Sequence, residues 1–175
     1  MAETFDQYRT RVLAYLGSRD PLRVQRRTPT QIERLLKSVP RATLLRRPAE
    51  DKWSIIEIIA HLADAELAMT WRLRSMVATP GVPLAWWDEA IWARRLEYQK
   101  VPWRDSLARF RSLRVANLSL LTSLPSTLWD ASFGVHETRG RQSVREFVTL
   151  EAAHDLNHMR QIRGLLRTDR SNPRR

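Results

Sequence analysis

Two of the four histidines in this chain lie four residues apart, in the stretch "EAAHDLNHMRQI". On a helix this spacing places His154 and His158 on one face, one turn or ~6 Å apart. Ring nitrogens so placed can bind a single divalent metal ion at ~2.0–2.1 Å. Zinc proteases use the same spacing in H-E-x-x-H, but here Asp155, Leu156 and Asn157 stand between the histidines, so the protease glutamate is absent. The pair therefore indicates a metal site of another kind, although two histidines packed in a helical core would show the same spacing.

A third histidine is expected, because two ligands hold a catalytic metal poorly. His61 in "IIAHLADAE" is the third ligand that we predict, since its neighbours one turn away, Ile58 and Ala65, are apolar. That places His61 at the border of a buried helix face, where small alanines leave room for an ion or a substrate. His136 lies between two glycines in a segment without helical periodicity, so we interpret it as a loop residue rather than a ligand.

Three carboxylates are spaced so that they can assist such a site. Glu57 lies one turn before His61, while Asp64 and Glu151 each lie three residues from a histidine. Each can accept a hydrogen bond that orients a ligand ring, or act as a catalytic base. Glu57 has a competing role as a helix cap, and the alternative for Asp64 is an ordinary helix-surface carboxylate.

The periodicity of the chain predicts the helices that position these residues. An S-x-x-E capping box at 54–57 precedes an apolar stripe that ends near 79–81, and a second box at 143–146 precedes a helix to about residue 166. Further helices are expected at residues 3–17, from a start at Thr28 and Pro29, near 86–96, and from Pro102 to about Leu121. We expect residues 129–142 to form a loop, and a short hairpin-like turn within it is an alternative that we do not favour. Because helices that each bury one stripe pack as bundles, the prediction is an all-α fold, a four-helix bundle with additional short connecting helices.

The length of 175 residues suits one domain, which we assign to residues 1–168, with residues 169–175 as a flexible basic tail. The chain has no cysteine, which excludes disulfides, thiolate ligands and a cysteine nucleophile. No apolar run reaches the ~20 residues that span a bilayer, and the first residues lack the pattern of a secretion signal. We therefore expect a cytoplasmic protein without a membrane partner.

The net charge of +11 indicates either an anionic partner or an arginine-rich surface. The basic residues are scattered and no recognition motif accompanies them, so nucleic acid is not the partner that we favour. The tryptophans also have two interpretations. Trp86, Trp87 and Trp92 form a lid over the metal pocket, or they pack between helices, which is the interpretation that we favour. Trp53 is expected to pack against Ile58 at a helix start.

The block "KWSIIEIIAHLADAE", followed far downstream by "AAHDLNHMRQI", resembles the DinB/YfiT-like superfamily, and in particular its DinB-type four-helix-bundle branch. The resemblance extends over residues 8–167. It implies a bundle in which three histidines hold a divalent metal ion, and the matching positions of this chain are His61, His154 and His158. It also implies a homodimer. Histidine ligation suits zinc, nickel, copper or iron, of which we expect zinc or nickel.

Proteins similar to this one include S-transferases and isomerases that use a low-molecular-weight thiol. The resemblance therefore implies a metal-dependent enzyme that activates a thiol or water for transfer to a small electrophilic substrate. Since the chain has no cysteine, the thiol would be a separate cosubstrate, which arginines near the pocket could bind through a carboxylate. Two alternatives stay open: a noncatalytic metal-binding stress-response protein and, less favoured, a nucleic-acid-associated protein.

Overall fold

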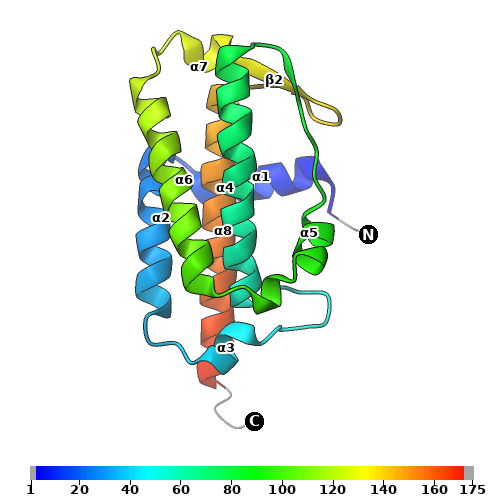
Figure 1. Ribbon diagram of the computed structural model, residues 1–175, viewed down its shortest axis with the longest axis vertical. Coiled ribbons are helices and arrows are strands. Elements are labelled where there is room, and N and C mark those ends of the chain that lie inside the picture. Colours follow the sequence, from blue (N-terminus) through cyan, green and yellow to red (C-terminus); the bar gives the residue numbers. More distant parts are fainter. Residues whose placement is uncertain (1–2, 172–175) are drawn as a thin grey trace.

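The computed structural model describes residues 3–171, which form a helical bundle with one small sheet (Figure 1). The four long helices of the bundle are α2 (Pro21–Leu36), α4 (Ile55–Ala78), α6 (Trp103–Ser123) and α8 (Val144–Ser171). The remaining helices are α1 (Phe5–Leu16), α3 (Arg41–Leu45), α5 (Glu89–Arg95), the single 3-10 turn η1 (Tyr98–Lys100) and α7 (Leu128–Ala131). Helix α1 packs across α8, at a steep angle to the bundle. The expected all-α four-helix bundle with short connecting helices is confirmed.

Helices α4 and α6 are parallel neighbours. Arg109 of α6 reaches Asp64, and Asn117 farther along α6 reaches Thr70 farther along α4, so contacts advance in the same direction. Helix α8 runs the opposite way (Figure 1). Parallel helices cannot be joined by a tight turn, and the chain returns along the bundle through residues 79–102. This crossover carries α5 past the first turns of α4, where His61 lies.

The capping boxes form as predicted. The backbone N–H of Ser54 donates to Oε2 of Glu57 at 2.9 Å, and the backbone N–H of Ser143 donates to Oε2 of Glu146 at 2.9 Å. Each bond satisfies an N–H that a helix start would otherwise leave without a partner. These caps fix the starts of α4 and α8, the two helices that carry the predicted ligands.

The predicted start of the second helix at Thr28 and Pro29 is wrong. Helix α2 begins at Pro21, and Asp20 caps it by accepting a hydrogen bond from the first turn at 2.6 Å. Proline suits the first helical position because its missing N–H would have no partner there. The Asp20–Pro21 pair therefore acts as the start signal, and Thr28 lies inside the helix, where its hydroxyl donates to the carbonyl of Val24 at 3.0 Å.

Pro29 is tolerated inside α2 because a side chain of another helix replaces the missing hydrogen bond. A proline at this position leaves the carbonyl of Gln25, four residues earlier, without its helical donor. Arg114 of α6 donates from Nη1 to that carbonyl at 2.9 Å. The local helix signal is thus overridden by a contact between residues 89 positions apart.

The segment expected to be a loop, residues 129–142, is largely structured. It contains α7 and most of a hairpin of β2 (Phe133–His136) and β3 (Gly140–Ser143), and β2 also pairs in parallel with β1 (Val82–Leu84). Gly134 permits this close approach, because a Cβ there would lie 2.5 Å from Cδ2 of Leu84. The strands are too short and too polar for an alternating pattern to reveal them, so the loop prediction for this segment is wrong.

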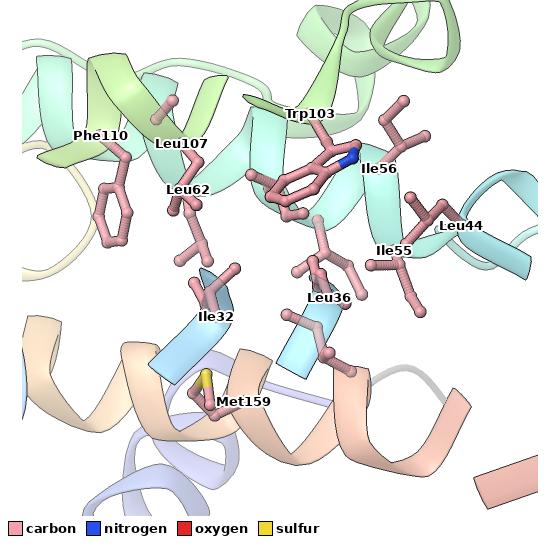
Figure 2. Close-up of a cluster of buried hydrophobic side chains, with 14 residues drawn as sticks. Ile32, Leu36, Leu44, Ile55, Ile56, Leu62, Trp103, Leu107, Phe110 and Met159 are labelled. Carbon is pink, nitrogen blue, oxygen red and sulfur yellow. The ribbon is translucent and has the colours of Figure 1, made fainter. Parts of the chain in front are cut away.

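The largest apolar cluster joins all four long helices at the end of the bundle near α3 (Figure 2). It includes Ile32 from α2, Leu62 from α4, Phe110 from α6 and Met159 from α8, each nearly inaccessible to solvent. Among the described residues, no helix is long and apolar enough to cross a membrane. Helix α8 continues to Ser171, so the predicted tail from residue 169 begins as helix, and its last part, residues 172–175, lies outside the described residues.

Candidate metal centre

The three histidines predicted as ligands converge on one point between α4 and α8. Nε2 of His154 lies 3.0 Å from Nε2 of His61 and 2.9 Å from Nε2 of His158. Within the part of the chain that the structure describes, these three form the one group of histidine and acidic side chains placed to hold a metal ion together. His61 comes from the second turn of α4, and the other two lie one turn apart on α8.

The three imidazoles are neutral, and the tautomer of His158 directs a lone pair toward the centre. Burial lowers the pKa of His154 to about 4, and it lowers the pKa of His61 and of His158 well below the ordinary value. Nδ1 of His158 lies 2.8 Å from Oε1 of Gln161. An amide oxygen only accepts, so Nδ1 carries the proton and Nε2 is left as a lone pair.

The distances fit a bound ion. Nitrogens held at ~2.05 Å from one ion, at angles of ~90–110°, lie ~2.9–3.4 Å apart. The two measured separations, 3.0 and 2.9 Å, fall in that range. Neutral imidazoles whose lone pairs meet in a buried place repel one another, and a divalent cation removes that cost. The donor set therefore fits a divalent metal with open positions.

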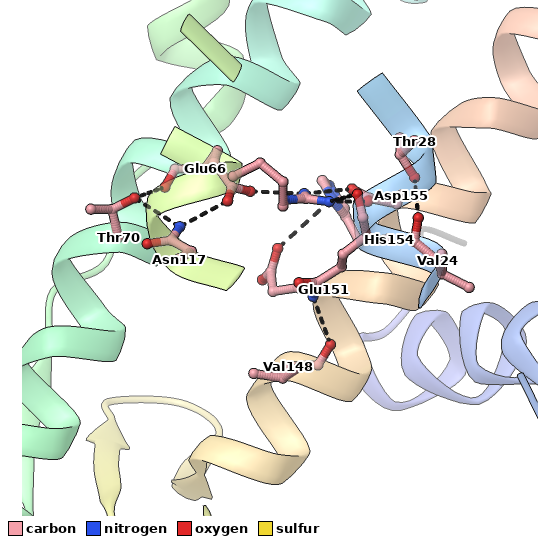
Figure 3. A network of polar contacts seen from close by, with 11 residues as sticks. Val24, Thr28, Glu66, Thr70, Asn117, Val148, Glu151, His154 and Asp155 are labelled. Carbon is pink, nitrogen blue, oxygen red and sulfur yellow. Dashed lines mark hydrogen bonds and ion pairs between the residues drawn. The ribbon is translucent and has the colours of Figure 1, made fainter. Parts of the chain in front are cut away.

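Two carboxylates flank the histidines. Oε2 of Glu151 lies 4.0 Å from Nδ1 of His154, and Figure 3 shows the two side chains together on α8. Burial, with further contributions from Glu66 and Asp155, raises the pKa of Glu151 to about 7. Oε2 of Glu89 lies 3.8 Å from Nε2 of His61. Glu89 was not among the predicted residues, because it reaches the site from α5 in the crossover and shares no periodicity with the ligands.

The other two predicted carboxylates lie elsewhere. Glu57 accepts hydrogen bonds from Ser54 and from Nε of Arg47 at 3.0 Å, so it serves the start of α4. Asp64 accepts the hydroxyl of Tyr98 at 2.6 Å and Nη2 of Arg109 at 3.0 Å. The structure therefore brings Glu151 to the histidines and leaves Glu57 and Asp64 as links between helices.

Aromatic rings enclose the histidines on one side. The ring of Trp53 lies 4.7 Å from that of His61, and the ring of Trp87 stacks on His61 at 5.7 Å between centroids. Trp92 packs against Trp87 at 4.7 Å. Trp86 is 61% exposed at the cavity rim. The tryptophans of the crossover therefore divide between the two interpretations. Trp92 packs against another ring, whereas Trp86 and Trp87 line the cavity.

A cavity of about 490 Å³ opens from the histidines, a size typical of small-molecule sites. Its lining includes Phe5 and Tyr8 of α1, Arg72 of α4 and the hairpin residues His136 and Arg139. His136, interpreted from the sequence as a loop residue, is buried on β2, and its Nδ1 accepts the backbone N–H of Thr138 at 3.2 Å. It lines the cavity without joining the three other histidines.

A buried polar network supports the site from behind. Arg114 of α6 donates to Asp155 of α8 at 2.6 and 3.1 Å and to Glu66 of α4 at 2.8 Å. Asn117 donates to Glu66 at 2.8 Å (Figure 3). Asp155 stands next to His154 in the sequence, where a charged residue on a helix is ordinarily expected to face solvent. It is buried and ties the ligand-bearing turn of α8 to α6.

Comparison with known proteins agrees with this geometry. A family model described as "DinB superfamily" matches residues 25–162. A protein of Halalkalibacterium halodurans described as a "putative metal-dependent hydrolase" is 23% identical over 141 residues, which cover 80% of this chain and 81% of the relative. One of Oceanobacillus iheyensis with the same description is 27% identical over 113 residues, 65% of this chain and 64% of the relative.

A solved structure shares the fold. YfiT from Bacillus subtilis, described as "a probable metal-dependent hydrolase with an unusual four-helix bundle topology", is similar with a TM-score of 0.78. The similarity covers 95% of this chain and 90% of YfiT at 18% sequence identity. The overall fold of this chain is therefore shared with YfiT.

Proposed function

This chain belongs to the DinB superfamily, and on that premise we propose that it is a metal-dependent enzyme that activates a nucleophile for attack on a small electrophilic substrate. The observation that carries the proposal is the convergence of three neutral histidine Nε2 atoms at 2.9–3.0 Å at one side of a substrate-sized cavity. Three protein ligands leave positions open, which is typical of catalytic rather than structural metal sites.

The ion would supply Lewis acidity, which lowers the pKa of a coordinated water or thiol toward ~7. The residues of the chain do the remaining work. Gln161 holds His158 in the tautomer that presents Nε2, as partners of metal-binding histidines generally do. Glu151 and Glu89 stand beside the histidines, where either carboxylate can accept a proton from the nucleophile. Trp87 and Trp53 cover the histidine side of the cavity and limit access of bulk water.

Water is the nucleophile that we propose first. Support comes from the relatives, which are described as metal-dependent hydrolases, and from the two carboxylates at the histidines. The alternative is a low-molecular-weight thiol that is transferred to the electrophile. Because the chain has no cysteine, that thiol would enter as a cosubstrate.

Turnover by zinc- or nickel-loaded protein tests the proposal. Small esters and amides are offered with water alone, and small electrophiles are offered with added thiols, for wild type, Glu151→Gln and Glu89→Gln. Loss of one carboxylate that acts as the base should reduce kcat ~10²–10⁴-fold without loss of metal. A loaded protein that turns over no member of either panel would favour the noncatalytic metal-binding alternative.

The choice of zinc or nickel, the homodimer and the cytoplasmic location belong to the same proposal. Metal analysis of protein from cells grown with both metals tests the first. Light scattering of the purified protein tests the dimer, and cell fractionation tests the location.

A further inference from the structure

Two arginines face the cavity of the histidines without an acidic partner. Arg72 of α4 is only 8% exposed, and Arg139 lies in the turn between β2 and β3. Among the residues that the structure describes, neither forms an ion pair with a carboxylate. The guanidinium of Arg72 donates to the backbone carbonyl of Ala85, and that of Arg139 lies 4.1 Å from the ring centroid of Phe5.

The contrast with Arg114 shows what Arg72 lacks. Both are buried, but two carboxylates pair with Arg114 and none pairs with Arg72, while Arg139 is exposed on the hairpin. A guanidinium remains charged at any accessible pH, so a buried one without a counter-ion leaves part of its desolvation cost unmet. Burial lowers the pKa of Arg72, as expected when loss of hydration disfavours the charged form. An anion that entered the cavity would supply the missing charge.

Two carboxylates of the cavity lie beside the histidines, and they act on the charges of the two arginines only from beyond ion-pair distance. Glu89 approaches His61 at 3.8 Å, and Glu151 approaches His154 at 4.0 Å. With a divalent ion at the histidines and the two arginines, the cavity is positive even when Asp88, Glu89 and Glu151, the three carboxylates that line it, are all ionised. The field in this cavity therefore favours a negatively charged ligand.

Much of the remaining lining is apolar, although Tyr8, Asp88 and His136 also contribute to it. Trp86, Trp87, Phe147, Leu150 and Met69 all line the same cavity. A ligand that suits the whole cavity thus combines one anionic group with a compact apolar body. A planar, forked guanidinium binds a carboxylate through two parallel hydrogen bonds, which makes a carboxylate the matching anion.

We propose that Arg72 and Arg139 bind the carboxylate of a small organic acid whose apolar body lies against the tryptophan wall, so that this acid is the substrate class of the site. The assignment of the acid as substrate rests on the proposed function, whereas its binding by the arginines does not. In this arrangement Arg72 and Arg139 determine specificity, and the histidines and their carboxylates perform the reaction.

Calorimetric titration of the full chain tests the proposal, in zinc-loaded and in metal-free form. The probes are acetate, phenylacetate and 4-phenylbutyrate, each paired with its neutral amide. At least one acid should bind about tenfold or more tightly than its amide, and Arg139→Met and Arg72→Met should each abolish most of that preference. Arg72→Lys keeps the positive charge but not the forked guanidinium. It shows whether lost binding in Arg72→Met comes from a folding defect at this buried position. The matched control is Arg141→Met on the same hairpin, whose guanidinium lies over Phe133 and which does not line the cavity.

The possible outcomes separate the two proposals. An acid preference that is lost in the arginine variants, with or without zinc, supports the arginine site. An acid preference that all arginine variants retain would mean that the metal alone holds the carboxylate, and equal binding of every acid and its amide would also overturn the proposal. A chain that takes up neither zinc nor nickel refutes the proposed function, while its metal-free titrations still decide on the arginines.

Discussion

The buried guanidinium of Arg114 allows the magnitude of a perturbation to be worked out from the structure. It makes four hydrogen bonds: two to Asp155 at 2.6 and 3.1 Å, one to Glu66 at 2.8 Å and one to the carbonyl of Gln25 at 2.9 Å. Arg114→Met keeps an apolar stem and removes all four. Removing one partner of a buried ion pair costs ~3–5 kcal/mol. Because two carboxylates and a carbonyl lose their donor here, we expect the upper part of that range, ~4–5 kcal/mol.

For a chain of this length, ~1 kcal/mol corresponds to ~2–4 °C in Tm, so Arg114→Met should lower Tm by ~8–20 °C. Urea unfolding, followed by circular dichroism and tryptophan fluorescence, measures the loss directly. The matched control is Arg111→Met, one turn earlier in α6, whose ion pair with Glu33 is exposed at 43% and 51%. That variant should change the free energy of unfolding by ~1 kcal/mol or less. A loss of similar size in both variants would refute the argument that the buried network ties the four helices together.

Four further substitutions test the local arguments by the same unfolding assay. Burial raises the pKa of Glu57, but hydrogen bonds with its arginine, serine and glutamine partners outweigh burial and lower the pKa below 4.5. The stabilisation that the ionised carboxylate contributes is therefore present above pH 4.5 and is lost as the pH falls through the lowered pKa. Glu57→Gln should therefore flatten the acid limb of the stability profile, and parallel profiles would contradict this. Asp20→Ala should cost ~1 kcal/mol through loss of the α2 cap, and an unchanged stability would argue against the corrected helix start. Gly134→Ala should cost ~1–3 kcal/mol because its Cβ would lie 2.5 Å from Leu84, whereas Gly164→Ala, with open space in α8, should gain ~0.5–1 kcal/mol. Equal effects at the two glycines would show that the close contact is relieved without cost.

The parts that sequence analysis predicted correctly depend on local patterns. The helix that carries His61 and the one that carries His154 and His158 each have a capping box and an apolar stripe, both of which are visible within a few residues. Helical periodicity then orients the imidazoles toward the core. Since the resemblance pairs the two blocks, the convergence of the three histidines could be anticipated before their distances were known.

The features that were missed depend on contacts between distant residues. Glu89 reaches His61 only because the crossover returns along α4, and nothing in "WWDEAIW" signals that path. Arg114 sits in an arginine-rich stretch that is typical of a solvated face, yet its partners lie 41, 48 and 89 residues away. The same arginine explains why Pro29 does not start a helix. Local patterns could not reveal that Arg114 joins the helices or that it supports Pro29 inside α2, because both roles are set by the packing of α6 against its neighbours.

The central claim, that three histidines hold one divalent ion, is tested most directly by elemental analysis of the purified chain without a histidine tag. The matched variants are His154→Ala, which removes the central ligand, and His136→Asn, which alters the fourth histidine of the same cavity. Circular dichroism confirms that each variant is folded. The account predicts one zinc or nickel ion per chain in wild type and in His136→Asn, and none in His154→Ala. A wild type that stays empty after incubation with either metal, or a His154→Ala variant that keeps its ion, would contradict it.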